Sequence, residues 1–360
     1  MTRQSSDKDE RAVRRIAGRL KRFWADAPAL RAALLCLACL LGPGAHRTLA
    51  EPAPKATAAF TTNQLGDSLS VVDLTAMKAV SEIKIGGKPA GIALAPGGAI
   101  AYVTAPESKE VVAVDLNTRS IRNRAVVGSG PLGIAAAPKG DRIYVVDWFD
   151  HKLYVADAAT LAVLGSVAVG NSPSGVAVTS DGQTILTADR DSNQVSIIDA
   201  ASLKVTATIP TGERPFGITI DAAGARAYTA NVASNSVTVL DLSTRTRVKD
   251  VAVGIRPYAV ALAAGRIFVT NQHAESVSVL DERTLESVKT LPVGSYPEGI
   301  EADPDGSAVY VACWDAKYAY WGIRPDQYDT TYVPLVPTPP FPGYPSGHAM
   351  ICGEIEELYS

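Results

Sequence analysis

The chain has 360 residues, of which 47% are hydrophobic and 20% charged, so it can bury a sizeable core and is too apolar to be disordered. Its formal net charge of -3 is unevenly distributed, because residues 1–50 carry 10 Lys/Arg whereas residues 51–360 carry 24 Lys/Arg against 33 Asp/Glu. The acidic net charge of residues 51–360 argues against binding to nucleic acid or to an anionic membrane surface.

The first fifty residues are organised like a targeting sequence. A basic segment is followed by an apolar run from Ala32 to Leu41, by helix-breaking Gly42-Pro43-Gly44, and by a small-residue site that ends at Ala50. A helix across a bilayer needs about 20 apolar residues, so this run suits a secretory signal better. We expect a signal peptide over residues 1–50, cleavage near Ala50, and a periplasmic or secreted chain that is not membrane-bound. An uncleaved signal anchor is the alternative.

An internal repeat follows the targeting sequence. An apolar-apolar-Asp step recurs with spacings of 42, 42, 42, 42 and 40 residues, and the Pro of a Gly-x-x-Pro step recurs with the same five spacings. The first mark falls at Asp73, Asp115, Asp157, Asp199, Asp241 and Asp281. The second falls at Pro89, Pro131, Pro173, Pro215, Pro257 and Pro297. Two independent marks in one register indicate a repeated structural unit.

Each unit has the pattern of four short strands. In the unit that starts at Pro173, alternating hydrophobicity predicts strands over 173–178, 184–188, 194–198 and 203–209, with a turn at Ser180-Asp181-Gly182. Four strands in about 42 residues are typical of a β-propeller blade. We therefore expect an all-β propeller of four-stranded blades. Because the Asp recurs in every unit, we expect it to accept backbone N–H bonds in a turn and not to act in one site.

The number of blades stays open at this point. Five complete four-strand sets lie between Pro89 and Val293, with three strands before them and two after them. These strands can close as six blades. Seven blades would require further strands from residues 313–360.

The second strand of each unit resembles the YVTN family of β-propeller repeats. The segments that carry the resemblance include Phe60-Thr-Thr-Asn63, Tyr102-Val-Thr-Ala105, Tyr228-Thr-Ala-Asn231 and Phe268-Val-Thr-Asn271. The resemblance covers residues 59–315, within a propeller domain expected over 51–315. It implies the fold, and it implies little about activity, since the family is mostly secreted or periplasmic propellers, some associated with quinone-dependent oxidation systems.

The segment over residues 316–360 lacks the repeat and is rich in Tyr and Pro. Lys317, Arg324 and Pro345-Ser346-Gly347-His348 resemble the first two signature blocks of the type 2 phosphatidic acid phosphatase and vanadium haloperoxidase superfamily. The resemblance implies that Lys317 and Arg324 hold oxyanion oxygens, that Ser346 and the Gly347 amide donate to them, and that His348 is an acid. No third block with the attacking His precedes Ser360, so we expect an incomplete half-site without independent catalysis. The alternative is a Pro-rich tail packed on the propeller.

The loops that follow the second strands should meet at one end of a propeller, where sites on repeat folds usually lie. The candidate binding face there consists of Trp148, Phe149, His151, Arg190, Asp191 and His273. The alternative is that these are ordinary solvated loops. No motif for a catalytic residue, a metal or a haem is present, so we expect no cofactor and no metal.

The sequence thus predicts a binding or scaffold module that presents one face to an unknown protein or small ligand. The alternatives are a hydrolase or lactonase at the channel mouth, a phosphoryl-transfer enzyme, or an accessory protein of a quinone-dependent oxidation system. Cys313 and Cys352 could pair in an oxidising compartment, and nothing in the sequence shows that they meet.

Overall fold

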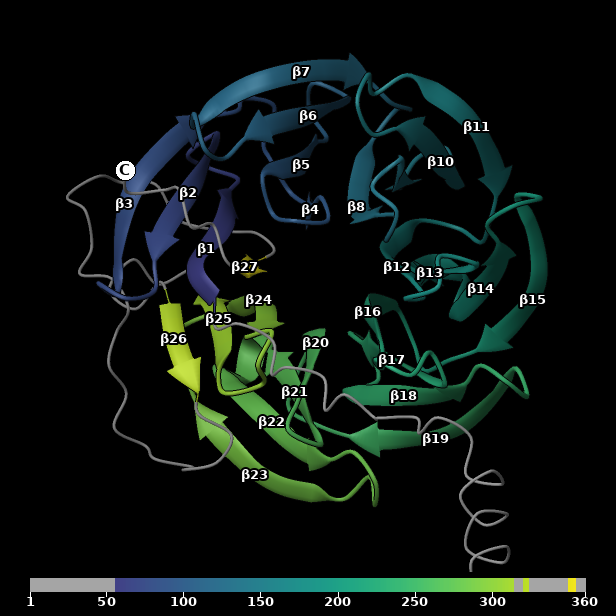
Figure 1. Ribbon diagram of the computed structural model, residues 1–360. Helices are drawn as coiled ribbons and strands as arrows, with labels where there is room; N and C mark the ends of the chain where they lie inside the picture. The colour runs from purple at the N-terminus through teal and green to yellow at the C-terminus, as the bar shows by residue number, and fades with distance from the viewer. Residues whose placement is uncertain (1–55, 314–319, 324–348, 354–360) are drawn as a thin grey trace, which may run out of the picture. The chain divides into compact units, whose positions relative to one another are not determined.

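The structure is a computed structural model that describes residues 56–313, 320–323 and 349–353, the last two segments as backbone only. Its strands form seven sheets, six of four strands and one of three. Figure 1 shows the sheets following one another around a ring, with the first strand innermost in every sheet but one, where β27 lies inside β1. We number the sheets 1 to 7 in chain order. This is the expected all-β propeller.

The first four sheets use the following strands. Sheet 1 contains β1 (Ala56–Asn63), β2 (Ser68–Asp73), β3 (Lys78–Lys84) and, inside them, β27 (Ala349–Gly353). Sheet 2 contains β4 (Ile92–Leu94), β5 (Ile100–Ala105), β6 (Glu110–Asp115) and β7 (Ser120–Val126). Sheet 3 contains β8 (Pro131–Ala136), β9 (Arg142–Asp147), β10 (Lys152–Asp157) and β11 (Val163–Ala168). Sheet 4 contains β12 (Pro173–Val178), β13 (Thr184–Asp189), β14 (Gln194–Asp199) and β15 (Lys204–Pro210).

The other three sheets complete the ring. Sheet 5 contains β16 (Pro215–Ile220), β17 (Arg226–Asn231), β18 (Ser236–Asp241) and β19 (Thr246–Ala252). Sheet 6 contains β20 (Pro257–Ala263), β21 (Arg266–Asn271), β22 (Ser276–Asp281) and β23 (Ser287–Pro292). Sheet 7 contains β24 (Pro297–Ala302), β25 (Val309–Cys313) and β26 (Tyr320–Ile323). Two short 3-10 turns, η1 (Arg190–Ser192) and η2 (Gln272–Ala274), lie in loops. Within these segments no helix has the length and hydropathy to cross a membrane.

The core lies between neighbouring sheets. Second strands such as β9 are buried along almost their whole length, whereas fourth strands such as β7 expose most of their side chains. One apolar cluster joins Tyr102 and Val111 of sheet 2 to Ile134 and Ile143 of sheet 3. Each sheet therefore needs its neighbours to cover both of its faces, which is why the sequence repeats as a unit.

The recurring Asp residues close turns, as expected. The backbone amides of Thr75 and Ala76 donate to Asp73 Oδ1 at 2.8 Å, and the amide of Thr244 donates to Asp241 Oδ1 at 2.8 Å. The turn at Asp181-Gly182 places Gly182 at φ +71, a conformation that favours glycine. These carboxylates are structural.

Glycines in the first strands, or directly before them, allow the sheets to approach closely at the centre of the ring. A Cβ at Gly91, Gly133 or Gly175 would lie within 3.0 Å of a backbone oxygen in the next sheet. The same Pro-x-Gly step places Gly217 against the Tyr258 carbonyl of sheet 6. The innermost strands therefore line a narrow channel with backbone and small side chains.

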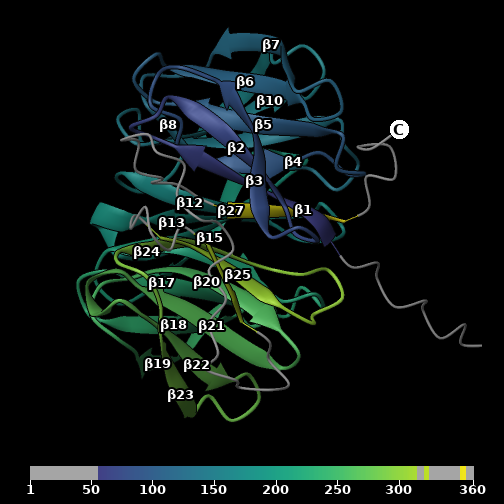
Figure 2. The same cartoon turned by 90° about the vertical axis from the view of Figure 1, so that its left-hand side faces the viewer.

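The ring is closed by the segment after residue 315. The strand β27 pairs antiparallel with β1, with Ile351 opposite Ala59 and Met350 opposite Phe60, and the two strands lie side by side in Figure 2. The strand β26 pairs with β25 in sheet 7. The predicted strand sets before, within and after the five complete units are all present. The strands before and after the five units do not join into one sheet: β27 adds to the first of them and β26 to the second, so the described strands form seven sheets.

Candidate functional site

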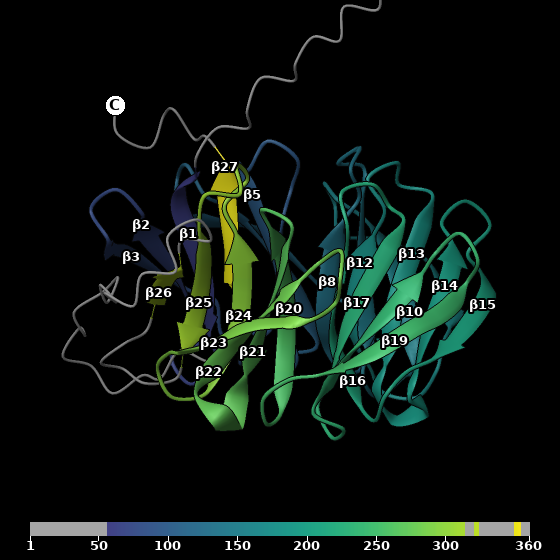
Figure 3. The same cartoon turned by 90° about the horizontal axis from the view of Figure 1, so that it is seen from below.

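We call one end of the ring the loop face. It consists of the loops between the second and third strands and the connections that lead from each sheet to the next; Figure 3 shows loops at both ends of the strands. The two kinds of loop hydrogen-bond to each other in the same way in several sheets. The Trp148 amide donates to Gly130 O at 3.0 Å, and the Val232 amide donates to Arg214 O at 2.9 Å. The backbone frame of the loop face is thus repeated.

Five of the six predicted face residues gather at the junction of sheets 3 and 4. The Arg190 guanidinium lies over the Trp148 ring, 5.2 Å from its centroid, and Arg190 Nη1 is 2.5 Å from Asp191 Oδ1. Phe149 is 67% exposed, and its ring occupies the space that a Cβ at Gly130 would fill. A cation over an indole face is attracted by the ring quadrupole, so the two sheets are linked at this point.

Buried and half-buried polar groups hold the Trp148-Phe149 loop in place. Asp147 Oδ2 accepts the amides of Ser129 and Gly130 at 2.7 Å, and its Oδ1 accepts the amide of Phe149 at 3.0 Å. Tyr154 donates its hydroxyl to Asp150 Oδ2 at 2.7 Å. Burial and this hydrogen bond raise the pKa of Tyr154 to about 12, so the phenol stays protonated as a donor. The two aromatic side chains are therefore presented on a rigid loop.

His151 has a structural contact within the repeated frame. It lies at φ +54, and its Nδ1 accepts the backbone N–H of Ser172 at 2.9 Å. The equivalent residue of sheet 4, Asn193, has φ +53 and accepts the Arg214 amide through its side-chain oxygen at 2.8 Å. The imidazole thus does what an Asn does elsewhere in the repeat. A role for His151 in binding stays a prediction.

His273 lies apart from the other predicted residues. It follows Gln272 in η2 of sheet 6, and its ring meets that of Tyr296 edge-on with centroids 5.7 Å apart. The structure does not bring His273 to the junction of sheets 3 and 4. The predicted face is therefore divided between two places on the ring.

A second cluster near His273 was not predicted. The Phe216 and Tyr258 rings are tilted at 33° with centroids 4.3 Å apart, and Gln272 Nε2 donates to Glu298 Oε1 at 2.5 Å. Gln272 Oε1 also accepts from Arg256 Nε. Burial first, and then the Glu298 charge, raise the pKa of Tyr258 well above its usual value. The sequence signal was the position after each repeated Pro, which varies from Ala90 and Leu132 to Phe216, Tyr258 and Glu298.

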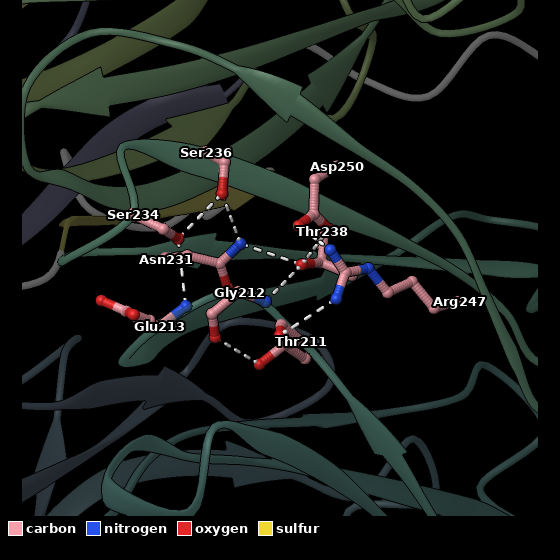
Figure 4. A network of polar contacts seen from close by, with 9 residues as sticks. All are labelled: Thr211, Gly212, Glu213, Asn231, Ser234, Ser236, Thr238, Arg247 and Asp250. Atoms are coloured by element: carbon pink, nitrogen blue, oxygen red, sulfur yellow. Dashed lines mark hydrogen bonds and ion pairs between the residues drawn. The ribbon is translucent and has the colours of Figure 1, made fainter.

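The Asn at the end of the YVTN-like strands anchors the loop face from inside. Figure 4 shows Asn231 of sheet 5, whose Nδ2 donates to Ser236 Oγ at 3.0 Å and to Thr238 Oγ1 at 2.9 Å. Thr238 in turn donates to Asp250 Oδ1 at 2.8 Å, and Asp250 pairs with Arg247. Because Asn231 is fully buried, it shapes the loops and is not exposed to a ligand.

A cavity of about 310 Å³ lies at the centre of the ring. The first strands of sheets 2 to 7 line it, mostly with glycine and aliphatic side chains, and among the described lining residues Glu301 of β24 is the one that is ionisable. Burial raises the pKa of Glu301 to about 7. Within the described segments no group of three or more His, Cys, Asp or Glu residues is placed to hold a metal ion.

The phosphatase-like residues Lys317, Arg324, Ser346, Gly347 and His348 lie outside the described residues, and so does the expected signal segment over 1–50. The phosphatase resemblance stays a prediction. Cys313 is buried at the end of β25, at the place of the motif Asn. The side chain of Cys352, in β27, is not described, so the pairing of the two cysteines stays open.

Comparisons with known proteins agree with the fold. The family model of the YNCE-like β-propeller matches residues 27–325. A hydrazine synthase structure from Kuenenia stuttgartiensis is 21% identical with a TM-score of 0.69, and the match covers 80% of this chain and 99% of that one. A functionally unknown protein from Desulfotomaculum acetoxidans DSM 771 is 15% identical with a TM-score of 0.70 (82% and 99% covered).

The dihydro-heme d1 dehydrogenase NirN in complex with DHE is 15% identical with a TM-score of 0.62, with 88% of this chain and 78% of that chain covered. No curated protein matches the sequence. At these identities the structural likenesses show the fold alone.

Proposed function

Because the chain belongs to the YNCE-like β-propeller family, we propose that it is a binding module that presents the junction of sheets 3 and 4 on its loop face to a partner protein or a small ligand. The observation that carries the proposal is the Trp148–Arg190 contact beside the exposed Phe149 ring. Aromatic residues and Arg dominate the binding energy of protein interfaces, and rings on a rigid loop lose little entropy on binding.

The repeat itself does not require large residues at this junction. The loop of sheet 5 has Val232, Ala233 and Ser234 where the loop of sheet 3 has Trp148, Phe149 and Asp150, and the backbone hydrogen bond of the first loop residue to the preceding connection is the same. A large aromatic pair at one junction is thus an addition to the frame. The NirN structure, in complex with DHE, supports the idea that a propeller of this kind serves ligand binding.

The test compares ligands retained by the full chain and by single variants. Phe149→Ala removes the most exposed aromatic ring of the junction. Leu65→Ala is the matched control, because Leu65 is 54% exposed and takes the same loop position in sheet 1. We expect proteins or small molecules that co-purify with the wild type, identified by mass spectrometry, to be lost with Phe149→Ala and kept with Leu65→Ala.

The thermal unfolding midpoint of each variant should equal that of the wild type, since both side chains are exposed. Trp148→Ala provides a second variant at the junction. Retention of every bound component by both Phe149→Ala and Trp148→Ala would show that the junction of sheets 3 and 4 is not the binding site.

We also propose that the protein is exported from the cytoplasm. The basic segment, the short apolar run and the small-residue site before Glu51 support export to the periplasm or the medium, with cleavage near Ala50. N-terminal sequencing of protein from cell fractions should give a mature end near Glu51. A chain that keeps its first fifty residues in the cytoplasm would contradict export.

A further inference from the structure

The central cavity contains an acidic group that the fold does not need. In the five other units, the position of Glu301, four residues after the repeated Pro, is taken by small residues: Ala93, Ala135, Ala177, Thr219 and Ala261. These sheets pack without a carboxyl at that place. The Glu301 side chain is therefore a local feature of sheet 7.

The described neighbours do not neutralise the Glu301 carboxyl. The hydroxyls that line the cavity donate elsewhere: Thr219 Oγ1 to Val260 O at 2.6 Å, and Ser174 Oγ to Phe216 O at 3.1 Å. Glu301 accepts a hydrogen bond from the backbone of Ala302, and no Lys or Arg of the described segments lies against it. A carboxylate among aliphatic groups is costly unless it is paired, and that cost is the reason for its raised pKa.

The other titratable groups near Glu301 have partners of their own. On β25, Tyr310 stands opposite Glu301 and donates its hydroxyl to Asp303 Oδ2 at 3.3 Å. On β24, Glu298 accepts from Gln272. On β20 the titratable residue is Tyr258, and on β21 Arg266 pairs with Asp281. On β27 it is Cys352, whose side chain is not described.

We propose that the central cavity binds a small organic ammonium ion, with the Glu301 carboxylate as its counter-ion and the aliphatic walls in contact with its carbon atoms. The volume of about 310 Å³ is at the lower end of small-molecule sites. Ca²⁺ or Mg²⁺ would need several oxygen ligands, whereas the described lining residues supply one carboxyl, so an organic cation fits this lining better. The proposal does not depend on the function of the loop face.

The test is calorimetric titration of the full chain with methylammonium, n-butylammonium and cyclohexylammonium, with n-butanol as the uncharged probe. We expect at least one ammonium ion to bind and n-butanol to bind at least tenfold more weakly. Because the pKa of Glu301 is about 7, the carboxyl is mostly ionised at pH 8 and mostly protonated at pH 6. The affinity for the ammonium ion should therefore fall about tenfold from pH 8 to pH 6.

Two variants and a control complete the test. Glu301→Gln keeps the size of the side chain, Glu301→Ala installs the residue found in the other units, and Glu275→Gln removes an exposed loop carboxyl as the control. Both Glu301 variants should lose at least tenfold in affinity and lose the pH dependence, with an unfolding midpoint no lower than that of the wild type. The control should bind normally. No binding of any ammonium ion at pH 8, or unchanged binding by Glu301→Gln, would overturn the proposal.

Discussion

His151 shows how a residue that looks functional in the sequence can be used by the frame. Its φ of +54 places it in the left-handed region, where Asn is favoured among non-glycine residues, and the equivalent positions in sheets 4 and 5 are Asn193 and Asn235. In all three, a side-chain atom accepts the amide of the residue before the next repeated Pro. From the sequence alone, a histidine among these asparagines looks like a functional residue. Its hydrogen bond to the Ser172 amide shows that it has the same structural role as the asparagines.

We expect His151→Ala to lower the free energy of unfolding by about 1 kcal/mol, because the Ser172 amide loses its acceptor. His151→Asn should restore most of this loss, since Asn supplies an acceptor at the same place in sheets 4 and 5. Urea denaturation of the two variants measures both effects. Equal destabilisation by Ala and by Asn would show that the hydrogen bond contributes little.

The last residue of the second strand is Asp in some sheets and Asn in others, so it accepts hydrogen bonds in the first case and donates them in the second. Asp189 is buried and accepts from Ser196 Oγ at 2.5 Å and from Thr187 Oγ1 at 2.7 Å, yet burial outweighs these bonds and raises its pKa. Asn231 fills the same place in sheet 5 as a donor to Ser236 and Thr238. The hydroxyls around this position can donate or accept, so the repeat tolerates either residue.

Among the elements, the turns between third and fourth strands carry the clearest dependence on pH. The backbone amide of Thr244 and the hydroxyl of Ser243 donate to Asp241 and lower the pKa of this carboxyl to about 2. The pKa values of Asp115, Asp157 and Asp281 are also lowered, in each case mainly by a backbone N–H of the same turn. The same turn motif thus makes the stability of several sheets depend on pH in the same way.

A carboxyl whose pKa is lower in the folded than in the unfolded chain stabilises the fold. This stabilisation is complete at a pH above the pKa of the unfolded chain, about 3.9 for Asp, and is lost as the pH falls toward the pKa of the folded state. We expect the urea midpoint of the wild type to fall between pH 5 and pH 2.5. Asp241→Asn keeps an oxygen acceptor without the charge, so it should lower the midpoint at pH 5 and differ less from the wild type at pH 2.5.

The exposed Glu286→Gln is the matched control for Asp241→Asn, and it should change the midpoint little at either pH. A constant difference between Asp241→Asn and the wild type across this range would show that the charge of the turn carboxylate does not stabilise the fold.

At the scale of the whole molecule, the sequence predicts what the repeat encodes and no more. The strands of the unit from Pro173 begin and end within one residue of their predicted bounds, because alternation, Asp and Pro mark each of them. The strands β26 and β27 have none of these marks. They exist because β25 and β1 offer open edges to pair with, which is a tertiary effect that local sequence does not contain.

The candidate site likewise was predictable only in the features that the repeat encodes. That Trp148 and Arg190 share one end of the ring was predictable, because both follow a second strand. Their contact across two sheets, the acceptor role of His151 and the aliphatic surroundings of Glu301 among the described residues depend on which sheets are neighbours and on the groups that face each side chain. Comparing each repeat position across the units would have marked Glu301, which replaces Ala or Thr.

Ring closure by β27 can be tested with two C-terminal truncations of the chain. Removal of residues 349–360 deletes the innermost strand of sheet 1, which leaves the inner edge of β1 without its hydrogen-bonded partner and uncovers the region around the buried Phe60. Removal of residues 354–360 leaves β27 whole and is the control. Since about 1 kcal/mol corresponds to roughly 2–4 °C in a domain of 150–250 residues, we expect the longer truncation to lower the thermal midpoint by at least about 5 °C and the control to change it little. The longer truncation should also self-associate more readily, because an open strand edge is a template for pairing with another chain.

Equal thermal midpoints for the two truncations would mean that sheets 1 and 7 hold the ring closed without β27.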